Sequence, residues 1–470
     1  MTGFILCVST FVIAVIAGRR SLVGGLGATM AVGYWYGYLR AVVPSSASHF
    51  VFDSAVIGLY VVQLFRMPAE GEPRESKGTR LWTIALAAWP VLLMAVPTQE
   101  PLVQLVGLRA AVLVLPFMLL GGRLTSRDVY RLALWCAALN VVAFAFGAAE
   151  FTFGLEKFLP HNAVTELNFL QDDAGGFGAG VARSYRIPST FPTSHAYGGT
   201  MVVTLPLLIG AWARRGSALW QRLLLMSALV ASGLGVFLAA SRYHALVMFV
   251  VLLVATFSGR VRVIYRVGAV VAILAVGVLV AKDSRLQRFK TLQDTEYVST
   301  RVGYSANRDV FTILAEHPLG NGLGGGGTNM PYFLRNRVHD LVAIENEYAK
   351  IALEQGFPGL TLWVVFLGWA FMRRPSAAGD PWFLGRRLAW TVGATYFSTA
   401  WIGLGMLTAI PQSALLLLCT GWMLTGRDGA RRGVVAGARP WSASPRVDAV
   451  PQFAGPQHAV PYLGDQRARA

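Results

Sequence analysis

The sequence is poor in charged residues for its length. Only 14% of its 470 residues are Asp, Glu, Lys or Arg, whereas soluble domains carry about 25%. Cysteine is scarce as well: Cys7, Cys136 and Cys419 all lie within apolar runs. Cysteines placed in this way are more typical of packing residues than of a disulfide framework or a metal site. The composition therefore excludes a soluble chain of two or three ordinary domains.

The sequence contains many long apolar runs. Several reach the roughly 20 residues with which a helix crosses a bilayer. The predicted spans are residues 3–17, 22–43, 49–65, 81–96, 100–121, 130–153, 196–213, 218–238, 243–258, 263–281, 346–371, 388–403 and 406–425. The first run has no basic residues before it and another run follows at once, so we expect a membrane helix rather than a cleaved signal peptide. The sequence predicts an all-α polytopic membrane protein with 13 transmembrane helices, or 12 if the short first span does not fully cross.

The net charge of +17 follows the predicted topology. Basic residues form short clusters between the apolar runs, and every cluster falls on one side once Arg260–Arg266 is placed in the cytoplasm. This is the positive-inside pattern, and it makes a nucleic-acid partner unnecessary. We expect a transmembrane domain over residues 1–425, near-neutral outer loops at 154–195 and 282–345, and a disordered cytoplasmic tail at 426–470.

Arginines near the predicted outer helix ends are candidates for binding an anion. Arg183 and Arg186 come shortly before the span at 196–213, and Arg242 lies in the short turn before the span at 243–258. A guanidinium group is planar and always charged, which suits phosphate. Headgroup-level anchoring explains such arginines equally well.

The second outer loop carries more polar candidates. Tyr297–Glu316 has an amphipathic helical pattern that includes Arg308, and the glycine-rich run His317–Gly327 follows it. No Gly-Lys-Ser/Thr follows these glycines, so an ATP-binding P-loop is excluded. His339 is a candidate general base because its ordinary pKa lies near neutral pH, although a single loop histidine is more often simply solvated. The histidines lack metal-ligand spacing, so we expect no metal.

The start of the span at 346–371 is polar on one side. Glu347, Lys350 and Glu354 follow one another at helical spacing and share one face. A polar face on a membrane helix predicts a water-filled cavity beside it.

Together these stretches resemble the O-antigen ligase and O-antigen or exopolysaccharide polymerase family, the Wzy-like bacterial membrane glycosyltransferases. The resemblance covers about residues 183–360 and rests on the order of short motifs. They are Arg186-Ile-Pro-Ser-Thr-Phe, Ser241-Arg242, Arg308 with His317-Pro-Leu-Gly-Asn-Gly-Leu-Gly, and Glu345-Asn-Glu-Tyr with Glu354-Gln-Gly-Phe-Pro-Gly-Leu.

The resemblance implies a GT-C-like fold in the bacterial inner membrane. It implies transfer of a glycan from a polyprenyl-diphosphate donor, such as undecaprenyl diphosphate, to an acceptor on the outer face. Lipid-linked oligosaccharide and membrane lipids are then the partners, with a flippase and a chain-length regulator as further ones. The donor already carries the energy for transfer, so no cofactor is expected.

The resemblance also assigns roles to residues. Arg186 and Arg242 match the diphosphate-binding arginines, and Arg183 and Arg308 are weaker candidates. Where the family often has His-Asn, this chain has Glu345-Asn346. Either Glu345 or His339, six residues earlier, therefore takes the role of general base. The departure favours a polysaccharide polymerase over an O-antigen ligase that joins glycan to a lipid A core.

Two other classes of membrane protein are alternatives to the enzyme. A flippase for the same lipid-linked glycan predicts internal repeats and broken helices, and the sequence shows no duplication. A structural membrane protein leaves the outer arginines unexplained.

Overall fold

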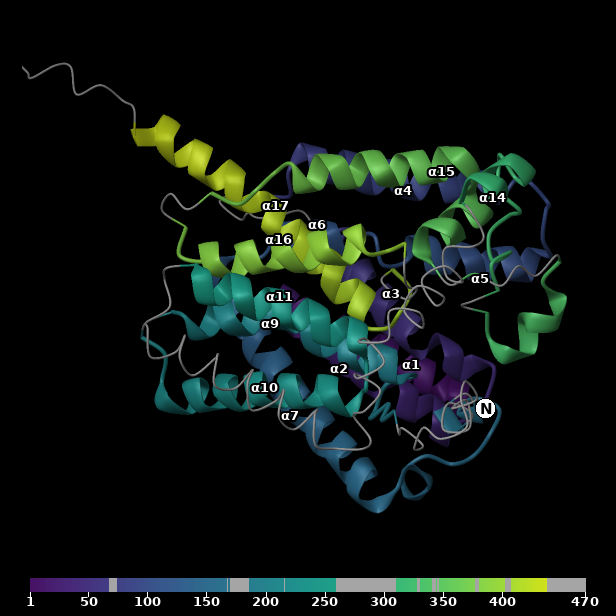
Figure 1. Cartoon of the computed structure of the whole chain (residues 1–470), viewed down its shortest axis with the longest axis horizontal. Helices are drawn as coiled ribbons and strands as arrows, with labels where there is room; N and C mark the ends of the chain where they lie inside the picture. The colour runs from purple at the N-terminus through teal and green to yellow at the C-terminus, as the bar shows by residue number, and fades with distance from the viewer. Residues whose placement is uncertain are drawn as a thin grey trace, which may run out of the picture. The chain divides into compact units, whose positions relative to one another are not determined.

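The computed structural model describes residues 1–66, 74–166, 168–169, 186–214, 216–258, 310–327, 330–339, 344, 346–376, 380–401 and 407–437 (Figure 1). All regular structure in these residues is helical. The elements are α1 (Thr2–Arg20), α2 (Leu22–Val42), η1 (Ala47–Phe50), α3 (Val51–Gln63), α4 (Lys77–Leu93), α5 (Pro101–Val112), α6 (Phe117–Gly122), α7 (Ser126–Phe153), η2 (Leu155–Lys157), α9 (Ser194–Trp212), α10 (Leu219–Leu238), α11 (Arg242–Phe257), α14 (Val310–Glu316), η4 (Tyr332–Arg337), α15 (Glu347–Phe371), α16 (Phe383–Ser398) and α17 (Gln412–Gly437).

The predicted spans agree closely with these helices. Twelve of the 13 predicted spans contain a described helix, and the remaining one, 263–281, lies outside the described residues. The span at 100–121 is divided into α5 and α6, because Pro116 has no N–H to donate and ends the first helix. Of the predicted amphipathic helix Tyr297–Glu316, the described part is α14. The last helix, α17, continues to Gly437, past the predicted end at 425.

Length and apolar character make several of these helices suitable for a bilayer. Five described helical segments are long and apolar enough to cross a membrane: Thr2–Arg20, Pro101–Gly122, Ser126–Phe153, Leu219–Leu238 and Glu347–Phe371. Large apolar side chains point outward from α1, among them Phe4, Ile5 and Ile16. An outward apolar face is the arrangement expected for contact with lipid. The chain is therefore an all-α polytopic membrane protein.

The three cysteines also behave as predicted. All three are free thiols, and Cys136 and Cys419 are buried in the bundle.

Helix α9 forms the centre of the bundle. It packs against α7, α10 and α16 and is buried along nearly its whole length. Helix α2 packs against α1, α3 and α7, and α4 lies beside α15 (Figure 1). Asn140 of α7 joins three of these helices: its Oδ1 accepts a hydrogen bond from Tyr34 at 2.6 Å, and its Nδ2 donates to Thr204 and Ser232, both at 2.8 Å. Each polar group of this buried amide is thus satisfied, as a membrane interior requires.

Segments between the helices gather at two ends of the bundle. At the first, here called the loop end, contacts join predicted outer segments: Tyr38 with Thr190, Gln99 with His339, His195 with His244, and Tyr243 with Thr399. At the other, the basic end, contacts join predicted inner segments: Arg123 with Glu75, Tyr130 with Gln221, and Arg386 with Asp380. The contacts therefore agree with the predicted alternation of the chain across a membrane.

Candidate functional site

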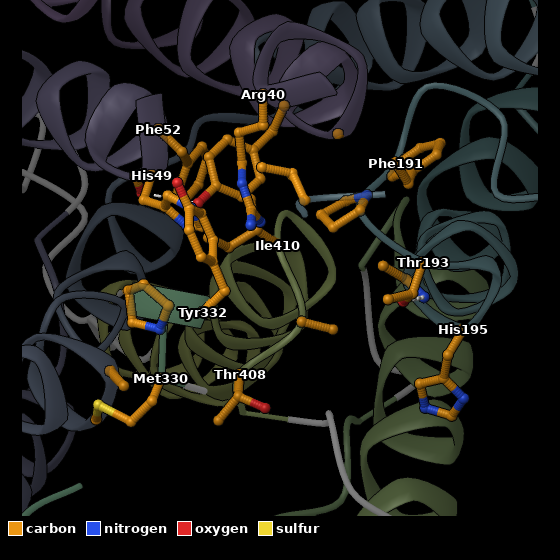
Figure 2. Close-up of a pocket in the computed structure, with 18 of the residues that line it drawn as sticks. Arg40, His49, Phe52, Phe191, Thr193, His195, Met330, Tyr332, Thr408 and Ile410 are labelled. Atoms are coloured by element: carbon orange, nitrogen blue, oxygen red, sulfur yellow. Dashed lines mark hydrogen bonds between the residues drawn. The ribbon is translucent and has the colours of Figure 1, made fainter. Parts of the chain in front are cut away.

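A cavity of about 690 Å³ opens at the loop end between α2, α3, α5 and the segments before α9 and α17 (Figure 2). Its volume falls within the range of small-molecule sites. The polar and aromatic side chains that line it include Tyr36, Arg40, His49, Asp53, Arg109, Glu166, His195, Tyr332 and Arg335. Three arginines and two histidines therefore face one cavity.

The deepest charges in this cavity are paired. Asp53 lies in the first turn of α3 and Arg109 in the last turn of α5, and the Arg109 Nε is 2.5 Å from the Asp53 Oδ2. The side chains are 6% and 19% exposed. The Arg109 guanidinium also lies 5.5 Å from the ring centre of Phe50. A buried charge in a membrane helix needs such a partner, and here the partner comes from a neighbouring helix.

Arg40 and His49 lie on one wall of the cavity, close to Phe52 and Tyr332 (Figure 2). The Arg40 guanidinium lies 5.1 Å from the ring centre of Tyr36, in cation–π geometry. The Tyr36 hydroxyl donates to the backbone oxygen of His49 at 2.7 Å. The His49 ring is 5.6 Å, centre to centre, from Tyr332. This wall thus combines a cation with flat aromatic surfaces.

The Arg186-Ile-Pro-Ser-Thr-Phe motif forms a strap across three helices. Ile187 N donates to the Leu238 oxygen of α10 at 3.1 Å, and Thr190 accepts from Tyr38 N of α2 at 3.1 Å. Ser189 has a positive φ of 53°. Its backbone N–H donates to the Glu150 carboxylate at 2.8 Å, which holds this unfavourable conformation in place. The strap is therefore a fixed structure that carries Arg186 at its start.

The strap ends against α2 at a glycine. A Cβ on Gly37 would lie 2.0 Å from the backbone carbon of Phe191. A side chain at this position would push the strap away from the cavity wall, so glycine is required for the close approach.

The Ser241-Arg242 motif begins α11 beside the strap. Arg242 lies four residues after Leu238, to which Ile187 is hydrogen-bonded, so the structure brings the Arg186 and Arg242 segments together. The Ser241 hydroxyl is 2.7 Å from the His244 Nδ1. The His244 ring in turn lies 4.4 Å from that of His195, which lines the cavity. Ser241, the residue before Arg242, is thus connected to the cavity wall through two histidines.

The glycine-rich run packs against protein backbone. Asn321 N donates to the Leu353 oxygen at 2.6 Å, and Phe357 N donates to the Pro318 oxygen at 2.9 Å. Helix α15 is broken between these contacts at Gly356, where φ is 66°. The break leaves the Leu353 oxygen and the Phe357 N–H without partners in the helix, and the two contacts supply partners for them. Two motifs that are separate in the sequence therefore form one unit, and the glycines serve close backbone packing.

The polar face predicted on α15 is present and buried. Glu347, Lys350 and Glu354 are 3%, 4% and 5% exposed. All three line a small cavity of about 20 Å³ beside Ala110 of α5, which is room for about one water molecule. A Cβ on Gly326 would lie 3.2 Å from the Glu354 Oε1, so the glycine-rich run also closes over this face.

His339 lies apart from the cavity lining. Gln99 fixes its backbone, since the His339 N donates to Gln99 Oε1 at 2.9 Å and Gln99 Nε2 donates back to the His339 oxygen at 3.1 Å. The histidine side chain itself is exposed. The remaining predicted site residues, Arg183, Arg308 and Glu345, lie outside the described residues.

Several cavity residues were missed by the motif-based prediction. Asp53 and Arg109 lie inside predicted spans 49–65 and 100–121, and Arg40 lies near the end of 22–43. A charge within an apolar run is itself a sign of a functional or paired group, so the sequence contained a usable signal for these three.

Comparison with known proteins bears on the second half of the described chain. Residues 226–364 match the family described as O-Antigen ligase, a stretch that begins in α10 and ends in α15 and contains Arg242 and the glycine-rich run. No curated protein shows significant similarity to the chain. The match supports a ligase-type or polymerase-type role in the synthesis of cell-surface glycans. Over residues 226–364, this polytopic membrane chain is thus similar to the O-antigen ligase family.

Proposed function

We propose that the protein is a membrane glycosyltransferase that polymerises glycan repeat units from a polyprenyl-diphosphate donor. The observation that carries the proposal is the O-antigen ligase match over residues 226–364, together with a large cavity at the loop end that adjoins the matched α11. A lipid-linked glycan has an anionic diphosphate, a sugar portion and an apolar tail. The arginines suit the diphosphate, and the cavity suits the sugar portion. The outward apolar helix faces suit the tail.

The reaction requires one bond to form and one to break. The acceptor hydroxyl oxygen bonds to the anomeric carbon of the donor, the bond from that carbon to the diphosphate oxygen breaks, and the polyprenyl diphosphate leaves. Negative charge builds on the leaving group, and arginines fixed before the reaction stabilise it. Arg186 and Arg242 take this role in the proposal, because the strap and the start of α11 hold their segments side by side. Arg183 and Arg308 remain secondary candidates.

A base must take the proton of the acceptor hydroxyl. His339 and Glu345 are the candidates, as the sequence predicts. The two hydrogen bonds with the Gln99 side chain fix the His339 backbone and leave the histidine ring exposed to an incoming substrate.

The setting of the proposed reaction is the outer face of a bacterial inner membrane, with undecaprenyl diphosphate as the carrier. A flippase would supply the donor there, and a chain-length regulator would limit the polymer. An O-antigen ligase that joins the glycan to a lipid A core is the second candidate function, because the matched family carries that description.

The test uses the purified full chain in lipid vesicles loaded with fluorescent lipid-linked oligosaccharide. Polymerisation predicts longer lipid-linked glycans and one polyprenyl diphosphate released per bond formed. Ligation predicts glycan release only when lipid A core is added. Passage of the glycan lipid across the vesicle membrane with no new glycosidic bond contradicts both candidates and indicates a flippase.

A further inference from the structure

The cavity wall formed by Arg40 and His49 has polar atoms without protein partners. The Arg40 Nε and the His49 Nε2 are both buried and lack a hydrogen-bond partner among the described residues. His49 is 4% exposed. Leaving a buried polar atom unsatisfied is unfavourable, so such atoms beside a cavity indicate a ligand that completes their hydrogen bonds.

The charges around this wall favour an anion. Asp53 is the nearest carboxylate on the neighbouring helix, and its Oδ2 is held by Arg109 at 2.5 Å. The other acidic residue in the lining is Glu166, which is exposed. The lining thus holds three arginines against two carboxylates, so positive charge is in excess, and a guanidinium group binds phosphate or carboxylate oxygens well.

We propose that Arg40 and His49 form a second anion subsite, which binds a phosphate or carboxylate group of the acceptor substrate. The Arg40 Nε–H and the His49 Nε2–H would each donate a hydrogen bond to the anion. The Tyr36 hydroxyl is already used, since it donates to the His49 backbone oxygen. The flat ring of Tyr332 on the same wall is partly exposed and suits the face of a sugar ring.

The position of this subsite separates it from the proposed donor site. Figure 2 shows Arg40 and His49 on one side of the cavity and His195 on the other. His195 lies against His244. His244 is the second residue after Arg242 in the sequence. An acceptor held by its anion at Arg40 would thus extend across the cavity toward the donor arginines. The identification of the ligand as an acceptor rests on the proposed function, whereas the anion subsite itself does not.

The test measures binding of two anionic probes to the purified full chain in nanodiscs. The probes are farnesyl diphosphate, which represents a lipid-linked phosphate, and glucuronic acid, which represents an acidic sugar; farnesol and glucose are their uncharged controls. The measurements use an Arg186→Gln/Arg242→Gln background, so that the proposed donor site does not contribute. The variants are Arg40→Gln, Arg40→Lys and His49→Gln. Arg337→Gln is the matched control, because Arg337 is an exposed loop-end arginine absent from the cavity lining.

We expect Arg40→Gln and His49→Gln each to weaken one anionic probe about tenfold, the effect of losing a charge-assisted hydrogen bond. Arg40→Lys should give a smaller loss, and Arg337→Gln and the uncharged probes should show no change. The probe that responds identifies the source of the anion. Equal anion binding by the background protein and both glutamine variants would overturn the proposal. If Arg40→Gln fails to insert, Arg40→Lys and His49→Gln decide the outcome in the same way.

A parallel transfer assay on the chain without background substitutions separates the two proposals. Arg40-dependent anion binding without any glycan transfer would contradict the proposed function and leave the subsite intact. Glycan transfer without Arg40-dependent binding would contradict the subsite alone.

Discussion

The Arg109 Nε lies 2.5 Å from the Asp53 Oδ2, inside the bundle and at the wall of the cavity at the loop end. The pair joins α5 to α3, and both side chains are largely buried. Asp53→Asn should therefore destabilise the protein by about 3–5 kcal/mol, because it leaves the Arg109 charge buried and uncompensated. Thermal unfolding of the purified protein in detergent measures this loss.

The matched control for that prediction is Asp53→Asn combined with Arg109→Leu. Removing both charges should restore much of the lost stability, since neither buried charge then lacks a partner. If the double variant loses as much stability as the two single variants lose together, the ion pair is not what holds α3 and α5 against each other.

The break in α15 gives a second prediction. Gly356 has a φ of 66°, and a Cβ there would lie 2.4 Å from the backbone carbon of Leu319. Gly356→Ala should cost more than about 1–3 kcal/mol, because it adds a steric clash to the strain of the conformation, and should lower activity by displacing the glycine-rich run.

Gly368 of the same helix provides the control. It is exposed, and a Cβ there meets no atom within 4 Å. Gly368→Ala should leave activity unchanged and leave stability equal or up to about 1 kcal/mol higher. Equal effects of the two alanines on the unfolding temperature would show that the break in α15 is not constrained.

The Glu75–Arg123 pair at the basic end predicts a pH dependence. Burial raises the pKa of Glu75, but the hydrogen bond and charge of Arg123 outweigh it, so that the pKa is lowered overall. A lowered folded-state pKa stabilises the protein above the unfolded pKa of about 4.3, and this contribution is lost as the pH falls below that value. Glu75→Gln should therefore reduce the fall in unfolding temperature between about pH 5 and pH 3. Identical pH profiles for the two proteins would exclude this contribution.

The general base is tested by His339→Ala and Glu345→Ala measured side by side. Loss of the base should lower the transfer rate by about 10²–10⁴-fold with donor binding retained. Full activity in both variants would show that the proton is taken by another group.

The sequence was sufficient to predict most of the helices. Apolar length is a local property, and the span at 130–153 lies within α7 for that reason. The contact between Asn321 and Leu353 was not predictable in the same way. It depends on a glycine-rich run folding back onto a broken helix, and the composition of that run does not identify the backbone against which it packs.

The candidate site was predictable only in part. Arg186 and Arg242 were found because they stand in motifs near helix ends, and the structure brings their segments together through Ile187 and Leu238. Arg40 and Arg109 have no such motif. Their common wall depends on how α2 and α5 pack around the cavity, a three-dimensional relation that residue spacing does not contain.

The central claim is that the arginines of the strap and of α11 hold the donor diphosphate during glycan transfer. The most direct measurement is the rate of polyprenyl diphosphate release by Arg186→Gln and Arg242→Gln in vesicles, with Arg337→Gln as the charge-matched control. The account predicts that each of the first two variants inserts normally and loses transfer by at least about 10²-fold, while Arg337→Gln retains the wild-type rate. Wild-type release by both Arg186→Gln and Arg242→Gln would contradict it.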